Sequence, residues 1–169
     1  MSPDAVCQEL IDYVNYIFVV AQNGGKLEEH TVRRDITRLF GKMHEQAVNN
    51  PELAGEIDRL QLPLVFYIDY MIKEGPFAFR DSWVELAKKF NELSGDEKFF
   101  DILDEHMGDP SSAATLRLRV LYQCLASGFD GCYVADHSDV ERKMRVCALR
   151  VGVDANQYEK AKITTDCYE

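Results

Sequence analysis

Long hydrophobic runs are absent from this sequence of 169 residues. No window approaches the ~18 consecutive apolar residues that a membrane-spanning helix needs, so no segment is predicted to cross a bilayer. The first residues, MSPDAVCQEL, lack a basic stretch followed by an apolar one, which argues against a secretory signal. Composition is otherwise that of a soluble globular protein, with 46% hydrophobic and 28% charged residues.

Cysteine is sparse and shows no pairing pattern. The five cysteines are odd in number, and no two are spaced as C-x-x-C. They are Cys7, Cys124, Cys132, Cys147 and Cys167. Such usage indicates a reducing compartment rather than a disulfide framework. Cys124 follows Val120 and Leu121 at helical spacing and is interpreted as a buried structural cysteine. Cys132 falls in a predicted loop with no neighbouring base to activate its thiol.

Basic residues are outnumbered, with 19 Lys and Arg against 29 Asp and Glu and a formal net charge of −10. Nucleic acids and anionic lipid surfaces attract Lys and Arg, so both are disfavoured as partners. The acid is concentrated in residues 92–109, where seven carboxylates accompany one lysine, whereas residues 141–150 hold four bases and one acid. Such blocks are usually solvated helix faces, and otherwise they are surfaces that dock a partner.

The sequence motifs of common catalytic sites are missing as well. Neither Gly-Lys pair is followed by Ser or Thr, which excludes a P-loop, and Ser127 lacks the flanking glycines of a nucleophile elbow. None of the four histidines follows Glu by three residues, so the ligand pair of di-iron helical bundles is absent. Glu97 and Asp101, one helical turn apart, are interpreted as solvated rather than as an acid–base pair. We predict no catalytic site, no metal and no cofactor.

Helical periodicity runs through nearly the whole chain. Apolar residues recur every three or four positions over residues 6–21 and again over residues 32–47. A third helix is predicted to start at Asn50-Pro51 and contains Pro63, where we expect a kink or a break. Its second half, residues 64–72, is apolar almost all round and should be central to the core.

Three later helices are predicted from capping boxes, in which a serine precedes a glutamate by three residues. The boxes begin at Ser82, Ser94 and Ser138. Between them, SSAATLRLRVLYQCLASG indicates another helix, capped by Ser111 or Ser112. No segment has the alternation and turn residues of a β-hairpin. We predict an all-α fold of seven or eight helices, packed as two small helical bundles within a single domain, residues 1–169.

The stretch LYQCLASGFDGCY, residues 121–133, is interpreted as the end of a buried helix. Gly128 stands where a left-handed residue closes a helix, and Phe129 is predicted to supply the apolar contact of a Schellman-type cap. Gly131 belongs to a second turn, and Tyr133 is expected to return to the core or its rim.

Two blocks of the sequence resemble the DotU/TssL family. GDEKFFDILDEHMGDP and LYQCLASGFDGCY match, in order, the family's Gly-Glu-Lys-Phe-Phe, Asp-Pro and Leu-Tyr-x-Cys-Leu-x-x-Gly-Phe-Glu-Gly-Arg-Tyr. Upstream, LPLVFYIDYMI is similar to the family's core helix, and Trp83 falls where a tryptophan is expected. The sequence departs from the pattern at Cys132, where arginine is usual, and at Tyr70, where glutamate is usual. The resemblance covers residues 5 to 150.

Family members are cytoplasmic domains of inner-membrane proteins in type VI and type IVb secretion systems. The resemblance therefore implies a domain that faces the bacterial cytoplasm, has no catalytic activity and is followed by a transmembrane anchor beyond Glu169. It also implies association with an IcmF/TssM-like inner-membrane protein and with the cytoplasmic baseplate, and it leaves self-association open. The alternative is a helical adaptor unrelated to secretion, or an enzyme or small-molecule binder that uses a cleft.

For partner contact we predict the acidic face of the helix that follows Gly95. The residues are Asp96, Glu97, Asp101, Asp104 and Glu105. If this face docks a basic partner, binding should weaken as the salt concentration rises, because salt screens exposed charges.

Overall fold

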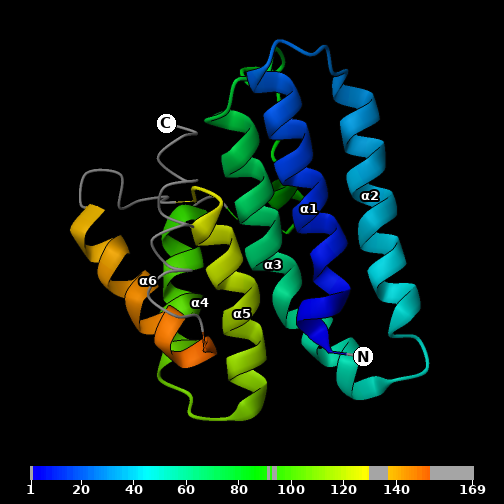
Figure 1. The fold of residues 1–169 in the computed structure, drawn as a ribbon. Helices are drawn as coiled ribbons and strands as arrows, with labels where there is room; N and C mark the ends of the chain where they lie inside the picture. The colour runs from blue at the N-terminus through cyan, green and yellow to red at the C-terminus, as the bar shows by residue number, and fades with distance from the viewer. Residues whose placement is uncertain (1, 91, 93–94, 130–136, 153–169) are drawn as a thin grey trace. The chain divides into compact units, whose positions relative to one another are not determined.

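The computed structural model describes residues 2–90, 92, 95–129 and 137–152. All regular structure in these residues is helical, with six α-helices and one 3-10 helix (Figure 1). The chain divides into two compact units, unit 1 (residues 1–93) and unit 2 (residues 94–169). The all-α prediction is confirmed, and the six α-helices of the described residues are slightly fewer than the seven or eight helices expected. No helix within the described part of the chain is long and apolar enough to span a membrane.

Unit 1 is built on α1 (Pro3–Gln22), α2 (Glu29–Gln46) and α3 (Pro51–Lys73) (Figure 1). Each of these helices contacts the other two. The apolar positions that recur along α1 and α2 are buried, as the sequence predicts. They are Val6, Leu10, Val14 and Ile17 in α1, and Val32, Ile36, Leu39 and Met43 in α2.

Helix α3 continues through Pro63, so the break that was one of the two outcomes expected at this proline does not occur. Its start matches the prediction, because Asn50 Oδ1 accepts a hydrogen bond from the Leu53 amide at 3.1 Å and Pro51 is the first helical residue. A proline inside a helix costs about 3 kcal/mol, but each large apolar side chain buried in the second half contributes about 1.5–3 kcal/mol. Those buried side chains include Leu64, Val65, Phe66, Ile68, Met71 and Ile72.

The helix predicted from a capping box at Ser82 is wrong. Ser82 lies in a turn, where its hydroxyl donates to the Phe79 carbonyl at 3.1 Å. The regular element that follows is the short 3-10 helix η1 (Leu86–Phe90), which packs on α3. The physical reason is a competing acceptor: the carboxylate of Asp69, rather than the Ser82 hydroxyl, binds the first amides of this helix.

Unit 2 contains α4 (Gly95–Met107), α5 (Ser112–Ala126) and α6 (His137–Val151), and α5 packs against both neighbours. Ser111 is the residue that caps α5, since its Oγ accepts from the Ala114 amide at 3.1 Å. Helix α6 begins at His137, one residue before the serine predicted to cap it, Ser138. The box predicted at Ser94 lies outside the described residues.

The end of α5 has the hydrogen bonds of a Schellman motif. Gly128 adopts φ +114°, which side-chain-bearing residues rarely reach, and its amide donates to the Leu125 carbonyl at 3.1 Å. The next amide, that of Phe129, donates to the Cys124 carbonyl at 3.2 Å. These two bonds satisfy carbonyls that the end of a helix otherwise leaves without partners.

The ring of Phe129 is fully buried and packs on α4. Its centroid lies 4.3 Å from that of Phe99 and 5.8 Å from that of Phe100. The apolar residue that follows the helix end therefore pins α5 to α4. Gly131 and Tyr133 lie outside the described residues.

Candidate docking surface

Helix α4 carries exposed carboxylates four residues apart. Glu97, Asp101 and Glu105 all face solvent, and this spacing aligns them on one side of the helix as an acidic stripe. Like charges at this spacing destabilise a helix by about 0.2–0.5 kcal/mol per pair. Within the described ranges, none of the three is paired with a cation. The stripe therefore carries a small stability cost that a basic partner would relieve.

Asp104, also predicted for docking, has a contact inside unit 2. Its Oδ1 accepts from Nζ of Lys143 on α6 at 2.5 Å, and the Lys143 side chain is only 6% exposed. A buried ammonium needs an acceptor or a counter-charge, so this carboxylate supports the packing of α4 with α6. The side chain of Asp96 lies outside the described residues. The structure thus brings Glu97, Asp101 and Glu105 together and gives Asp104 a structural contact.

The turn between α4 and α5 is held by Arg150 of α6. Its guanidinium donates to Thr115 Oγ1 at 2.8 Å and to the backbone carbonyls of Met107, Asp109 and Ser111. Hydrogen bonds from the backbone and side chain of Ser111 hold the pKa of the Asp109 carboxyl below its ordinary value. The Asp-Pro motif of the sequence is therefore part of an ordered turn.

The basic block predicted as a solvated face is divided by the structure. Lys143 and Arg150 contact other parts of unit 2 through their charged groups. Arg142 and Arg145 are exposed, and Arg142 pairs with Asp139 one turn away at 2.8 Å. Sequence alone did not separate the two groups because the partners of Lys143 and Arg150 lie more than 30 residues away.

We expect Arg150→Ala to lower the free energy of unfolding by about 1–3 kcal/mol, because several carbonyls lose a charged donor. Arg150→Lys keeps the positive charge but lacks the planar guanidinium with its several donors. It should therefore restore less than half of the free energy of unfolding that Arg150→Ala loses. Urea denaturation gives the free energies, and hydrogen exchange of the amides in residues 108–111 reports on the turn. Wild-type exchange in Arg150→Ala would show that the turn is ordered by its own backbone contacts.

The buried carboxylate of unit 1 belongs to Asp69 in α3. Its Oδ1 accepts from Trp83 Nε1 at 2.9 Å and from the Leu86 amide at 2.8 Å, and its Oδ2 accepts from the Ala87 amide at 3.0 Å. Burial raises the pKa of Asp69, and these three hydrogen bonds partly offset the effect. Sequence reasoning assigned Asp69 no role; the available signal was a lone acid within the apolar residues 64–72.

Trp83 is covered by Arg33 of α2. The guanidinium carbon lies 4.0 Å from the ring centroid, and Arg33 Nη2 donates to the Val84 carbonyl at 2.7 Å. A cation over an indole face contributes about 0.5–1 kcal/mol at an exposed site. Residues of α2 and α3 therefore hold the segment that leads into η1 from two directions.

The described cysteines are all buried. Burial raises the pKa of the Cys7 and Cys147 thiols to about 12, so both are protonated at neutral pH. Cys124 is fully buried within α5, as predicted, and Cys132 lies outside the described residues. No group of three or more His, Cys, Asp or Glu side chains in the described part of the chain is arranged to hold a metal ion.

Comparisons with known proteins agree with the fold. The sequence model of a family described as Type VI secretion system protein DotU matches residues 5–163. No curated protein matches the chain in sequence. Among solved structures, the cytoplasmic domain of TssL from Acinetobacter baumannii is similar, with a TM-score of 0.72, 19% identity, and coverage of 95% of this chain and 99% of that one. At this identity the structural similarity shows a shared fold.

Proposed function

This chain belongs to the DotU family of type VI secretion system proteins, and on that basis we propose that it is a non-catalytic structural component of a secretion membrane complex. The family match argues against the alternative of a helical adaptor unrelated to secretion. In this proposal the domain faces the bacterial cytoplasm from the inner membrane. Its partners are an IcmF/TssM-like inner-membrane protein and the cytoplasmic baseplate.

The observation that carries a docking role is the acidic stripe of α4. Glu97, Asp101 and Glu105 span two helical turns, about 12 Å at 1.5 Å per residue. Aligned carboxylates make the local electrostatic potential more negative. This potential steers a positively charged surface toward the helix and fixes its register. We therefore propose that a basic surface of the IcmF/TssM-like protein docks along this stripe.

The test uses charge reversal at Asp101 and Glu105 together. We expect Asp101→Lys with Glu105→Lys to weaken binding to the cytoplasmic part of the IcmF/TssM-like protein by at least about tenfold, because attraction becomes repulsion. Affinity is measured by isothermal titration calorimetry at about 0.05 M and about 0.3 M salt, where screening should weaken the wild-type complex. Asp104 is left intact because it pairs with Lys143.

The matched control is Glu45→Lys with Glu52→Lys, two exposed sites of unit 1 that give the same change in net charge. We expect this control to bind the partner within about twofold of wild type, since surface changes away from an interface have small effects. An equal loss of affinity in both double variants would show that binding depends on the net charge of the domain and not on the acidic stripe. Unchanged affinity in the α4 variant would remove the stripe from the interface while leaving family membership intact.

A further inference from the structure

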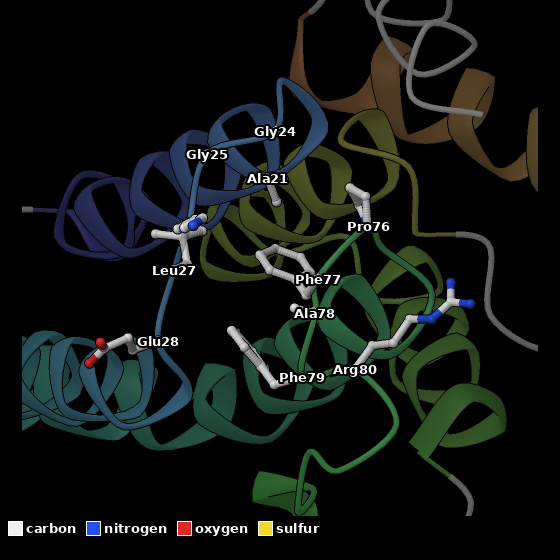
Figure 2. A pocket seen from close by; sticks show the side chains of 11 residues that line it. Ala21, Gly24, Gly25, Leu27, Glu28, Pro76, Phe77, Ala78, Phe79 and Arg80 are labelled. Atoms are coloured by element: carbon white, nitrogen blue, oxygen red, sulfur yellow. The ribbon is translucent and has the colours of Figure 1, made fainter.

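Unit 1 carries an open groove of about 760 Å³ between two loops (Figure 2). One wall is formed by residues 24–28, which join α1 to α2, and the other by residues 76–80, which follow α3. Figure 2 shows the rings of Phe77 and Phe79 extending from the second segment toward Leu27 on the first. The volume is within the range of about 300–1,000 Å³ that is usual for ligand sites.

The aromatic side of the groove is anchored in the core of unit 1. Phe77 is buried and packs edge-on against Phe18 of α1, with a centroid distance of 6.2 Å. Phe79 lies 5.5 Å from Phe77 and 5.9 Å from Trp83, whose indole is hydrogen-bonded to Asp69. This chain of contacts gives the groove a preformed apolar surface, so little ordering is needed when a ligand binds.

The opposite wall begins with two glycines. Gly24 has φ +81°, and a Cβ on Gly25 would lie 2.5 Å from Val20 Cγ1 and 2.8 Å from the Val20 carbonyl oxygen. The loop therefore cannot take this path with larger residues at Gly25 unless it shifts. Gly24 leaves the start of this wall without a side chain, so the backbone of an extended peptide can approach closely there.

Two of the three charged residues that line the groove are basic, although the chain has a net charge of −10. Lys26 and Arg80 are exposed on the two facing segments. Lys26 forms no ion pair with the residues that the structure describes, and the Arg80 contact with the exposed Asp81 is long, at 3.9 Å. Figure 2 shows Glu28 and Arg80 at opposite ends of the groove, so the acid does not neutralise the guanidinium.

From this geometry we propose that the groove binds a short acidic peptide segment of a partner protein. One large apolar side chain of the peptide packs against Phe79, which the buried Phe77 supports, and neighbouring carboxylates face Lys26 and Arg80. The apolar contact supplies affinity, and the charges select acidic over basic segments. This surface takes a partner of the opposite charge from the one proposed for the acidic stripe of α4, so the two proposals stand independently.

The probe is a panel of synthetic nonapeptides, each with Phe, Leu or Trp at the centre and Asp or Glu elsewhere. Counterpart peptides replace every acid by Lys, or the central residue by Ala. We expect acidic peptides to bind the full chain at least about tenfold more tightly than either counterpart, a free-energy difference of about 1.4 kcal/mol. Calorimetry measures affinity, and amide chemical shifts of Gly24, Gly25 and Ala78 locate the site.

Lys26→Glu with Arg80→Glu should weaken binding of the acidic peptides at least about tenfold, whereas Arg34→Glu with Arg38→Glu on the exposed side of α2 is the charge-matched control. The double reversal at Asp101 and Glu105 should leave peptide binding unchanged, which separates this test from the previous one. Absence of binding across the panel, or equal binding of the Lys-containing counterparts, would overturn the proposal. Binding of anionic phospholipid vesicles in place of peptide would do so as well.

Discussion

Asp69→Ala is expected to lower the free energy of unfolding by about 3–5 kcal/mol, because it removes the acceptor of three buried hydrogen bonds. The indole of Trp83 and the amides of Leu86 and Ala87 would then lie in the protein interior without their acceptor. A buried donor left unsatisfied costs about 1–3 kcal/mol, and the three losses are not fully additive. Urea denaturation followed by far-UV circular dichroism measures the change.

Two further variants make the result specific. Asp69→Asn keeps one acceptor oxygen but places an amide NH2, itself a donor, beside existing donors, so we expect a loss smaller than that of Asp69→Ala and above about 1 kcal/mol. Asp58→Ala removes an exposed carboxylate from the same helix and should stay within about 0.5 kcal/mol of wild type. A loss below about 1 kcal/mol for Asp69→Ala would mean that water replaces the carboxylate as acceptor.

Phe129→Ala is expected to destabilise unit 2 by about 3–5 kcal/mol, the usual cost of truncating a fully buried phenylalanine. The change leaves a cavity beside Phe99 and Phe100 and removes the apolar contact that joins the end of α5 to α4. Hydrogen exchange measures the effect, which should appear as faster exchange of the protected amides in α4 and α5.

Phe129→Leu provides a graded comparison, because it retains much of the buried volume and should cost less than half as much. Leu149→Ala is the control within the same unit, since that side chain is 81% exposed on α6. Exchange rates in Phe129→Ala equal to those of the control would show that the helix end is held by the hydrogen bonds of Gly128 and Phe129 alone.

Local sequence signals predicted most of the helices. Apolar residues that recur every three or four positions located α1 and α2. The caps at Asn50 and Ser111 located the starts of α3 and α5. The failure between α3 and α4 has a clear cause. The amides that begin η1 bond to a carboxylate 17 and 18 residues earlier in the chain, and no local pattern encodes such a contact.

The sequence predicted the two candidate surfaces, the acidic stripe and the groove, to different extents. Charge counting located the acidic stripe, but it could not show that Asp104 is engaged by Lys143, because the two residues are 39 positions apart. The groove was missed altogether. Its walls come from two loops of ordinary composition, and no sequence motif marks them as a binding site.

Trp83 is the single tryptophan of the chain and lies in unit 1, against the Asp69 carboxylate and beneath Arg33. Its intrinsic fluorescence therefore reports on unit 1, whereas the far-ultraviolet signal samples the helices of both units. Emission and ellipticity that change at the same urea concentration would indicate one cooperative transition, and separated midpoints would indicate two. One indole thus supplies a built-in optical reporter that distinguishes the two halves of the chain without any attached label.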